Sequence, residues 1–93
     1  MKKSPTVEHL PERGRFQTVV DGRTCVCDYR LAGRAMEITH TGVPPAVEGR
    51  GIAADLVAAA LAHARANGWK VRPICSYVQA YMLRHPETLD LLA

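Results

Sequence analysis

The sequence has no long apolar run and few aromatic residues. Its 93 residues include one Trp, one Phe and three Tyr, and no apolar stretch approaches the roughly 20 residues that a membrane-spanning helix needs. The charged start, Met1-Lys2-Lys3, is not followed by an apolar stretch, so a secretory signal peptide is not expected. From these absences we expect a cytoplasmic protein that does not contact a membrane.

Cysteine is also scarce, with three residues, Cys25, Cys27 and Cys75. An odd number excludes a complete disulfide framework, and free thiols suit a reducing compartment. Cys25 and Cys27 are too close together for a typical zinc-binding pair, and no second pair of ligands lies nearby. We therefore expect no metal, and we expect Cys25 and Cys27 to be small buried hydrophobes.

Positive charge is present but is not concentrated. Twelve basic residues against nine acidic ones give a net charge of +3, and the arginines are spread along the chain. Nucleic-acid-binding domains of this size usually cluster their Lys and Arg residues, so nucleic acid is not an expected partner. Either the charge is scattered over the surface, or a few arginines meet at one phosphate-sized pocket.

The length allows one domain with one modest core. Residues 1–12 contain two prolines and mixed charge, which indicates an N-terminal tail or an irregular lead-in, and residues 13–93 are expected to form the domain. Three β-prone stretches begin this domain, at residues 15–20, 23–31 and 35–41. The dipeptide Asp21-Gly22 between the first two is a typical hairpin turn, which predicts an antiparallel meander.

The second half of the chain has helical spacing. Apolar residues recur on one face of a helix predicted over residues 50–67, at Ala53, Leu56, Val57, Ala60, Leu61 and Ala64. A strand is predicted over 69–77, although Pro73 indicates a place where pairing stops. Short helices are predicted over 78–84 and 87–92. The order β-β-β-α-β-α predicts an α+β fold.

Alternation predicts which strand residues share a face. Cys25, Cys27, Tyr29 and Leu31 are expected on one face of their strand. On the next strand, Met36, Ile38 and His40 are expected to share a face opposite Glu37, Thr39 and Thr41. His40 would then be either a buried histidine or a catalyst.

The segment Gly49-Arg50-Gly51-Ile52-Ala53 lies between a strand and the long helix. Glycine lets the backbone approach a ligand closely, and the first amides of a helix carry the positive end of its dipole. Together these features predict a site for an anion such as a pyrophosphate, with the Arg50 charge beside it.

This segment resembles motif A of the GNAT acyltransferase superfamily, Gln/Arg-x-x-Gly-x-Gly/Ala. Here it falls on residues 48–53, with a match at Gly51 and Ala53 and with Glu48 at the first position. Four segments together resemble the small stand-alone YidJ-like subgroup, also described as N-acetyltransferase domain-containing, at residues 39–44, 49–53, 73–78 and 81–86. This resemblance covers residues 15–92. Members typically have an acidic residue where Gly42 stands.

The resemblance implies a trimmed GNAT fold that binds acetyl-CoA as substrate, with the pantetheine in a gap between two splayed parallel strands. It implies cofactor-binding residues at Thr41, Val43, Gly49, Arg50, Gly51, Ile52 and Ala53. Asp21-Gly22 joins the first two strands directly, so the acceptor-binding helices of larger members are missing and an open, shallow acceptor site is expected.

Four residues are candidate catalysts. The resemblance places Cys75 near the acetyl thioester, where a thiolate could form an acetyl-cysteine intermediate if a basic neighbour or a helix N-terminus lowers its pKa. His40 is the candidate basic neighbour. Direct transfer instead needs a proton donor for the leaving thiolate, and Tyr77 or Tyr81 is the candidate.

Two other functions stay open. A non-catalytic CoA-binding or interaction module is favoured by Glu48 and Gly42, whereas a small nucleic-acid-binding protein is disfavoured by the scattered charge. The acetyl acceptor is an unknown amine on a small molecule or a protein. The chain is expected to be a monomer, or a weak homodimer through an unpaired strand edge at Arg15 or Cys25.

Overall fold

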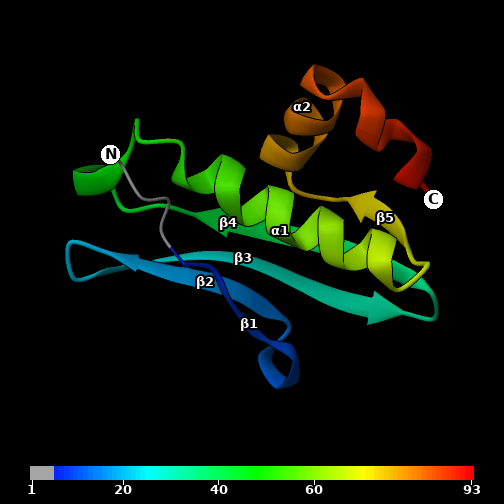
Figure 1. Cartoon of the computed structure of the whole chain (residues 1–93), viewed down its shortest axis with the longest axis horizontal. Helices are drawn as coiled ribbons and strands as arrows, with labels where there is room; N and C mark the ends of the chain where they lie inside the picture. The colour runs from blue at the N-terminus through cyan, green and yellow to red at the C-terminus, as the bar shows by residue number, and fades with distance from the viewer. Residues whose placement is uncertain (1–5) are drawn as a thin grey trace.

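The computed structural model describes residues 6–93 (Figure 1). Its strands are β1 (Glu8–Leu10), β2 (Arg15–Val20), β3 (Arg23–Ala32), β4 (Ala35–Gly42) and β5 (Lys70–Pro73). Its α-helices are α1 (Ile52–Ala66) and α2 (Ser76–Arg84), and 3-10 turns lie at Pro11–Arg13, Pro45–Val47 and Pro86–Leu91. Residues 1–5 of the expected tail lie outside the described residues.

The five strands form one sheet in the order β1-β2-β3-β4-β5. The first four are antiparallel to their neighbours, and β5 pairs parallel with β4 through the α1 crossover. This arrangement confirms the predicted α+β fold and its meander. The expectation of an irregular lead-in is wrong for Glu8–Leu10, which pairs with β2 from Gln17 to Arg15.

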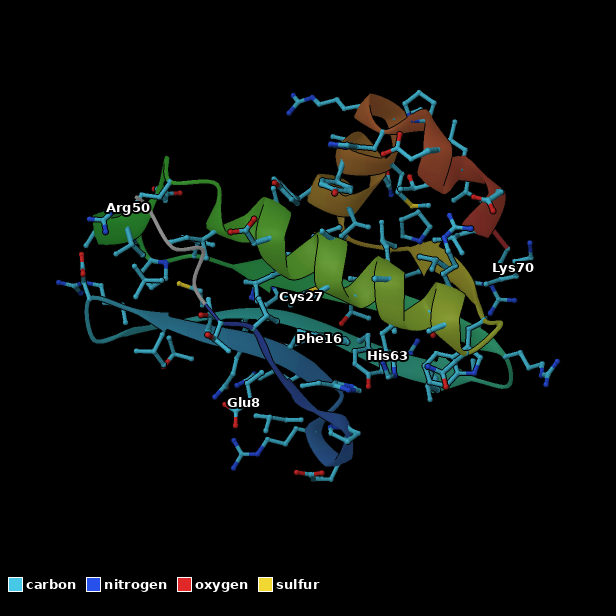
Figure 2. The ribbon with its side chains drawn as sticks, viewed as in Figure 1. Glu8, Phe16, Cys27, Arg50, His63 and Lys70 are labelled. Carbon is cyan, nitrogen blue, oxygen red and sulfur yellow. The ribbon has the colours of Figure 1, made fainter. Side chains whose placement is uncertain are left out.

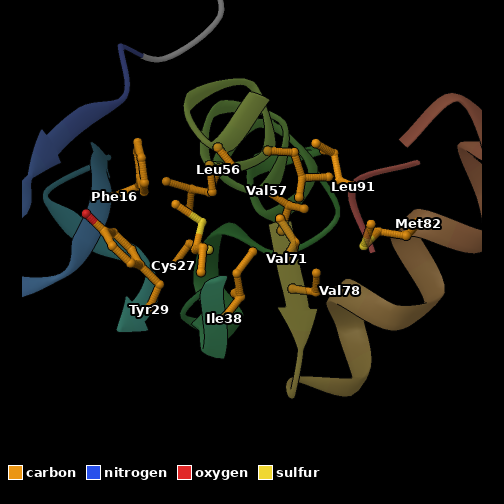
Figure 3. Packing of buried hydrophobic residues seen from close by; sticks show 14 of the residues in the cluster. Phe16, Cys27, Tyr29, Ile38, Leu56, Val57, Val71, Val78, Met82 and Leu91 are labelled. Atoms are coloured by element: carbon orange, nitrogen blue, oxygen red, sulfur yellow. The ribbon is translucent and has the colours of Figure 1, made fainter. Parts of the chain in front are cut away.

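Helix α1 lies against one face of the sheet (Figure 1). It begins and ends close to the predicted limits, and the predicted stripe is buried at Leu56, Val57, Ala60, Leu61 and Ala64. Figure 3 shows Leu56 and Val57 above the inward side chains of the sheet, with the core continuing toward α2. Alanine in the stripe removes side-chain bulk, so the helix backbone can approach the strands.

The chain after Trp69 differs from the prediction. Strand β5 ends at Pro73 instead of continuing to residue 77, and α2 begins at Ser76. The N–H of Ile74 bonds to the carbonyl of Arg72, at 3.0 Å, which closes a three-residue turn centred on Pro73. Near the other end of β5, Leu92 forms a parallel bridge with Val71 and returns the chain end to the sheet.

Within residues 6–93, no helix has both the length and the apolar character needed to cross a bilayer.

Candidate functional site

A cavity of about 520 Å³ opens where β4 ends and α1 begins. Its walls come from the end of β4, the loop before α1, the first turn of α1 and the first turn of α2. The lining residues are Thr41, Gly42, Val43, Val47, Glu48, Gly49, Gly51, Ile52, Ala53 and Tyr77. Six of the seven residues expected to bind the cofactor are therefore together at this cavity, and Arg50 is not among its lining residues.

The cavity exists because β4 and β5 separate. Their parallel pairing runs from Ala35 with Lys70 to Ile38 with Pro73, and one further bond joins the N–H of Cys75 to the carbonyl of Ile38, at 3.0 Å. Beyond this point β4 continues to Gly42 while the other chain turns into α2. Gln79 of α2 donates a side-chain hydrogen bond to the carbonyl of Pro73, at 2.9 Å, and fixes the turn.

A β-bulge in β4 decides which side chains face the cavity. Thr41 pairs with Cys27 and His40 with Asp28, but Ile38 pairs with Tyr29, so Thr39 has no partner in this register. One extra residue reverses the alternation beyond it. The prediction that His40 shares a face with Ile38 is therefore wrong: His40 lies beside Asp28 and is exposed, whereas Thr41 is on the side of buried Cys27.

The glycine turn leaves the start of α1 free of side-chain capping. Gly49 and Gly51 have φ of 81° and 77°, in the left-handed region that favours glycine. The first intrahelical bond runs from the N–H of Asp55 to the carbonyl of Gly51, at 3.1 Å, and no side chain among residues 6–93 caps the start of the helix. The amides of residues 52–54 thus point out of the helix end without intrahelical partners, which suits an anion.

Arg50 is held away from this turn by an ion pair. Its Nη1 lies 2.8 Å from Oδ2 of Asp21 in the β2–β3 hairpin, and both side chains are exposed. Figure 2 shows Arg50 near the opposite end of the molecule from Lys70. The Arg50 guanidinium that was expected beside the anion site is present, but it is paired with the carboxylate of Asp21.

Two lining residues differ from the pattern that the resemblance implies, Glu48 from the motif and Gly42 from the acidic residue that members typically have there. Glu48 lines the cavity with an exposed carboxylate at the position where the motif has Gln or Arg. A Cβ at Gly42 would lie 2.9 Å from Nε2 of His40, so an acidic side chain at this position would require the imidazole to move.

Val47 lines the cavity but was not among the residues expected there. It is buried, with 1% of its surface exposed, and ends the 3-10 turn Pro45–Val47. The available signal was its isolation: it is the one large apolar residue between Val43 and Ile52 in a loop of Pro, Gly and charged residues.

Cys75 immediately precedes α2 and contacts the cavity wall through Thr41. Its Sγ lies 3.5 Å from Oγ1 of Thr41. Burial raises the pKa of the thiol, but hydrogen bonds from Thr41 and from the backbone of Val78 and Tyr77 outweigh burial, so the pKa of Cys75 lies below its ordinary value.

His40 is not among the groups that lower the pKa of Cys75, and the α2 N-terminus provides part of the effect. Burial, with the nearby charges of Asp28 and Cys75, raises the pKa of Cys27 to about 12. Of these two thiols, Cys75 is therefore the one placed to ionise.

The two candidate tyrosines occupy different places. Tyr77 is 37% exposed and lines the cavity. Tyr81 lines a neighbouring cavity of about 250 Å³, where its ring stacks on His85 at 4.0 Å between centroids. Burial, with the charges of Glu87, Tyr77 and Asp55, raises the pKa of Tyr81, so its phenol stays protonated at neutral pH. Tyr77 also lines this second cavity and is the residue common to both.

Comparison with known proteins agrees with this architecture. The model of the GCN5-related N-acetyl-transferase family matches residues 15–91, so this chain belongs to that family. This result confirms the resemblance to the GNAT superfamily seen in the sequence.

Particular relatives extend the match. The chain is 36% identical to Protein NATD1 of Mus musculus over 83 residues, covering 86% of this chain and 76% of that protein. It is also 36% identical to Protein NATD1 of Homo sapiens, over 74% of that protein's length. The fold matches the solution structure of a GCN5-like protein from Staphylococcus aureus with a TM-score of 0.76, at 23% identity, covering 95% of this chain and 87% of that one.

Proposed function

We propose that this protein binds acetyl-CoA and transfers the acetyl group to an amine, with Cys75 as the intermediate acceptor. The observation that supports the proposal is the cavity, which joins the uncapped start of α1 to the opening between β4 and β5. At this opening the sulfur of Cys75 contacts Thr41, so the proposed nucleophile lies next to a lining residue of the cavity, although Cys75 is not itself a lining residue.

The proposed binding uses backbone groups more than side chains. The amides of residues 52–54 would bind the pyrophosphate, because they have no intrahelical partners and lie at the positive end of the helix dipole. On the β5 side, the pairing of β4 with β5 ends at Ile38, so backbone groups at Thr41 and Val43 are our candidates to bind the amides of the pantetheine.

The proposed chemistry starts at the thiolate of Cys75. Its sulfur attacks the thioester carbonyl, a bond forms between Cys75 and the acetyl carbon, and the carbon–sulfur bond to coenzyme A breaks. Tyr77, at the cavity wall, is our candidate to donate the proton that the departing thiolate takes up. Tyr81, which lines the neighbouring cavity, is a second candidate for this proton donor.

The second half of the reaction regenerates the thiolate. The amine nitrogen attacks the acetyl carbon on Cys75, the cysteine sulfur leaves as thiolate, and the proton that the amine loses replaces, through the base and solvent, the proton that Tyr77 gave up. His40 is our candidate base for an amine that approaches from the exposed face of the sheet, where this side chain lies. The acceptor is an amine of a small molecule or a protein. The free thiols fit a reducing compartment, and we propose the cytoplasm.

Calorimetric titration with acetyl-CoA and with free coenzyme A tests the binding step. We expect both to bind, and pantetheine alone to bind more weakly because it lacks the pyrophosphate. Absence of binding at millimolar ligand would overturn the proposal.

Intact-protein mass spectrometry tests the transfer. After incubation with acetyl-CoA, the chain is expected to gain the mass of one acetyl group, located at Cys75 by peptide mapping. Cys75→Ala should bind coenzyme A normally and gain no acetyl group. The matched control is Cys25→Ala, because the Cys25 thiol is fully buried whereas the Cys75 thiol is only partly buried.

A second candidate is a module that binds coenzyme A without turnover, which the exposed carboxylate of Glu48 at the cavity rim favours. Binding without acetylation of Cys75, and without transfer to a panel of amines, would support this module over the transferase.

A further inference from the structure

The hydroxyl of Thr41 is the side-chain group that contacts the sulfur of Cys75. Thr41 belongs to β4 and Cys75 precedes α2, 34 residues later, yet Oγ1 and Sγ lie 3.5 Å apart. Simple alternation would place Thr41 with Thr39 and Glu37, facing away from the sulfur. The bulge at Thr39 turns it inward, opposite Cys27.

The direction of this hydrogen bond depends on the charge of the sulfur. With a neutral thiol either atom can donate, but a thiolate has no hydrogen and the hydroxyl must then be the donor. A hydrogen bond that the hydroxyl donates to the thiolate stabilises this charged form of the cysteine. Backbone groups act on the same sulfur, from Tyr77 and Val78 at the start of α2 and from Thr41 itself, and these stay in place when the Thr41 hydroxyl is removed.

The bond also constrains where the sulfur points. Threonine is branched at Cβ and stiff at χ1, and Thr41 is anchored in the β3–β4 ladder by its pairing with Cys27. Since Thr41 lines the cavity, a sulfur bonded to its hydroxyl is held at the cavity wall.

We propose that Thr41 is a positioning residue: its hydroxyl donates a hydrogen bond to the thiolate of Cys75 and holds the sulfur toward the cavity for attack on the thioester. This inference rests on the proposed function. It adds to that function a side-chain role for a residue whose expected role was limited to backbone contacts with the pantetheine.

The test measures the rate of alkylation of Cys75 by iodoacetamide as a function of pH, resolved by peptide mass spectrometry. Thr41→Val removes the hydroxyl and keeps the branched shape. We expect it to move the midpoint of the profile upward by about half to one pH unit. Thr41→Ser should restore the midpoint, which a purely structural role for the branched side chain would not do.

The matched control is Thr39→Val, which removes a neighbouring hydroxyl on the same strand. That hydroxyl bonds to the carbonyl of Asp28, at 3.4 Å, and Thr39 is exposed. The control should leave the profile of Cys75 unchanged. An unchanged midpoint in Thr41→Val, with urea unfolding showing a folded protein, overturns the proposal. So does a shift of equal size in the control.

This readout does not depend on coenzyme binding, so it separates the two proposals. If wild-type protein fails to bind acetyl-CoA but Thr41→Val shifts the alkylation midpoint, the hydrogen bond is correct and the proposed function is wrong. If both hold, Thr41→Val should acetylate Cys75 about three- to tenfold more slowly at neutral pH, measured at saturating acetyl-CoA so that a change in affinity does not enter the rate. An unchanged acetylation rate at saturation contradicts the positioning role.

Discussion

Among the described residues that line the cavity, Glu48 is the one that carries a charge, and its charge is negative. It lines the cavity one residue before the glycine turn, and its carboxylate is not paired in an ion pair among residues 6–93. A pyrophosphate bound on the α1 amides would therefore meet a like charge at the rim. Because the side chain is exposed, water and salt screen this repulsion, and its cost is about 1 kcal/mol at most.

We predict that Glu48→Gln strengthens coenzyme A binding by about three- to fivefold, since it removes this repulsion and keeps the shape of the side chain. Calorimetry at low and at high salt measures the change, which should shrink as salt rises. Glu12→Gln is the control, because Glu12 is an exposed carboxylate in the turn before β2 and outside the cavity. Equal tightening in both variants would mean that only net charge matters.

At the scale of elements, the sequence predicts well whatever depends on local pattern. The buried stripe of α1 follows from apolar residues that recur about every 3.6 residues. The β2–β3 hairpin follows from Asp21-Gly22, whose φ values of 51° and 73° are both positive. The position of the glycine turn, and with it the lining residues Gly49, Gly51, Ile52 and Ala53, follows from the strand–turn–helix order, whereas Thr41 and Val43 were expected from the family resemblance. These features need no knowledge of distant parts of the chain.

The misplaced side chains share a different cause. Alternation assumes an unbroken strand, but the bulge at Thr39 is defined only by the register of β4 against β3. It exchanges the faces of His40 and Thr41, and with them the group that contacts Cys75. The early end of β5 likewise depends on the packing of α2, whose Gln79 bonds to the carbonyl of Pro73. Tertiary contacts therefore determine which side chains of β4 face the site and where β5 ends, and the local sequence pattern does not contain this information.

The ion pair between Arg50 and Asp21 links two elements, the glycine turn and the β2–β3 hairpin. Both side chains are about half exposed or more, so the pair contributes roughly 1 kcal/mol or less. We predict that Asp21→Asn frees Arg50 for the pyrophosphate and strengthens coenzyme A binding about two- to fivefold. Asparagine tolerates the positive φ of 51° at this position, so the turn should survive.

A double-mutant cycle on coenzyme A affinity isolates this mechanism. In an Arg50→Gln background, Asp21→Asn should have no effect on the affinity, because the guanidinium that it releases is absent. If Asp21→Asn tightens binding equally in both backgrounds, the aspartate acts by simple repulsion and Arg50 is not released.

At the scale of the whole molecule, an aromatic and histidine cluster joins β1 to α1. His9 stacks on Phe16 with 4.2 Å between ring centroids and meets His63 of α1 edge-on at 4.4 Å. Its Nε2 is 2.6 Å from the hydroxyl of Tyr29, and His63 packs in turn against Trp69. Figure 2 shows Phe16 and His63 on facing elements. The short strand β1 is therefore attached to the helix by one imidazole.

Protonation of His9 is unfavourable in this position. Burial lowers its pKa below the ordinary value, the nearby charge of His63 lowers it further, and Glu12 opposes both. As pH falls below about 6.5, the unfolded chain takes up the proton before the folded chain does. The contribution of His9 to stability is therefore complete above this pH and is lost progressively as pH falls toward the lowered pKa.

We predict that His9→Phe flattens the pH dependence of stability between about pH 7.5 and 5, the range in which an ordinary histidine titrates. Phenylalanine keeps the stacking on Phe16 but removes the partner of the Tyr29 hydroxyl, so at pH 7.5 the variant should be less stable by about 1 kcal/mol. Urea unfolding of both proteins across this range measures the difference, and carboxylates common to both cancel. The variant should lose less stability than the wild type on acidification; an equal loss in both would show that His9 titrates alike in the folded and unfolded chain, and that β1 is not held by a neutral imidazole.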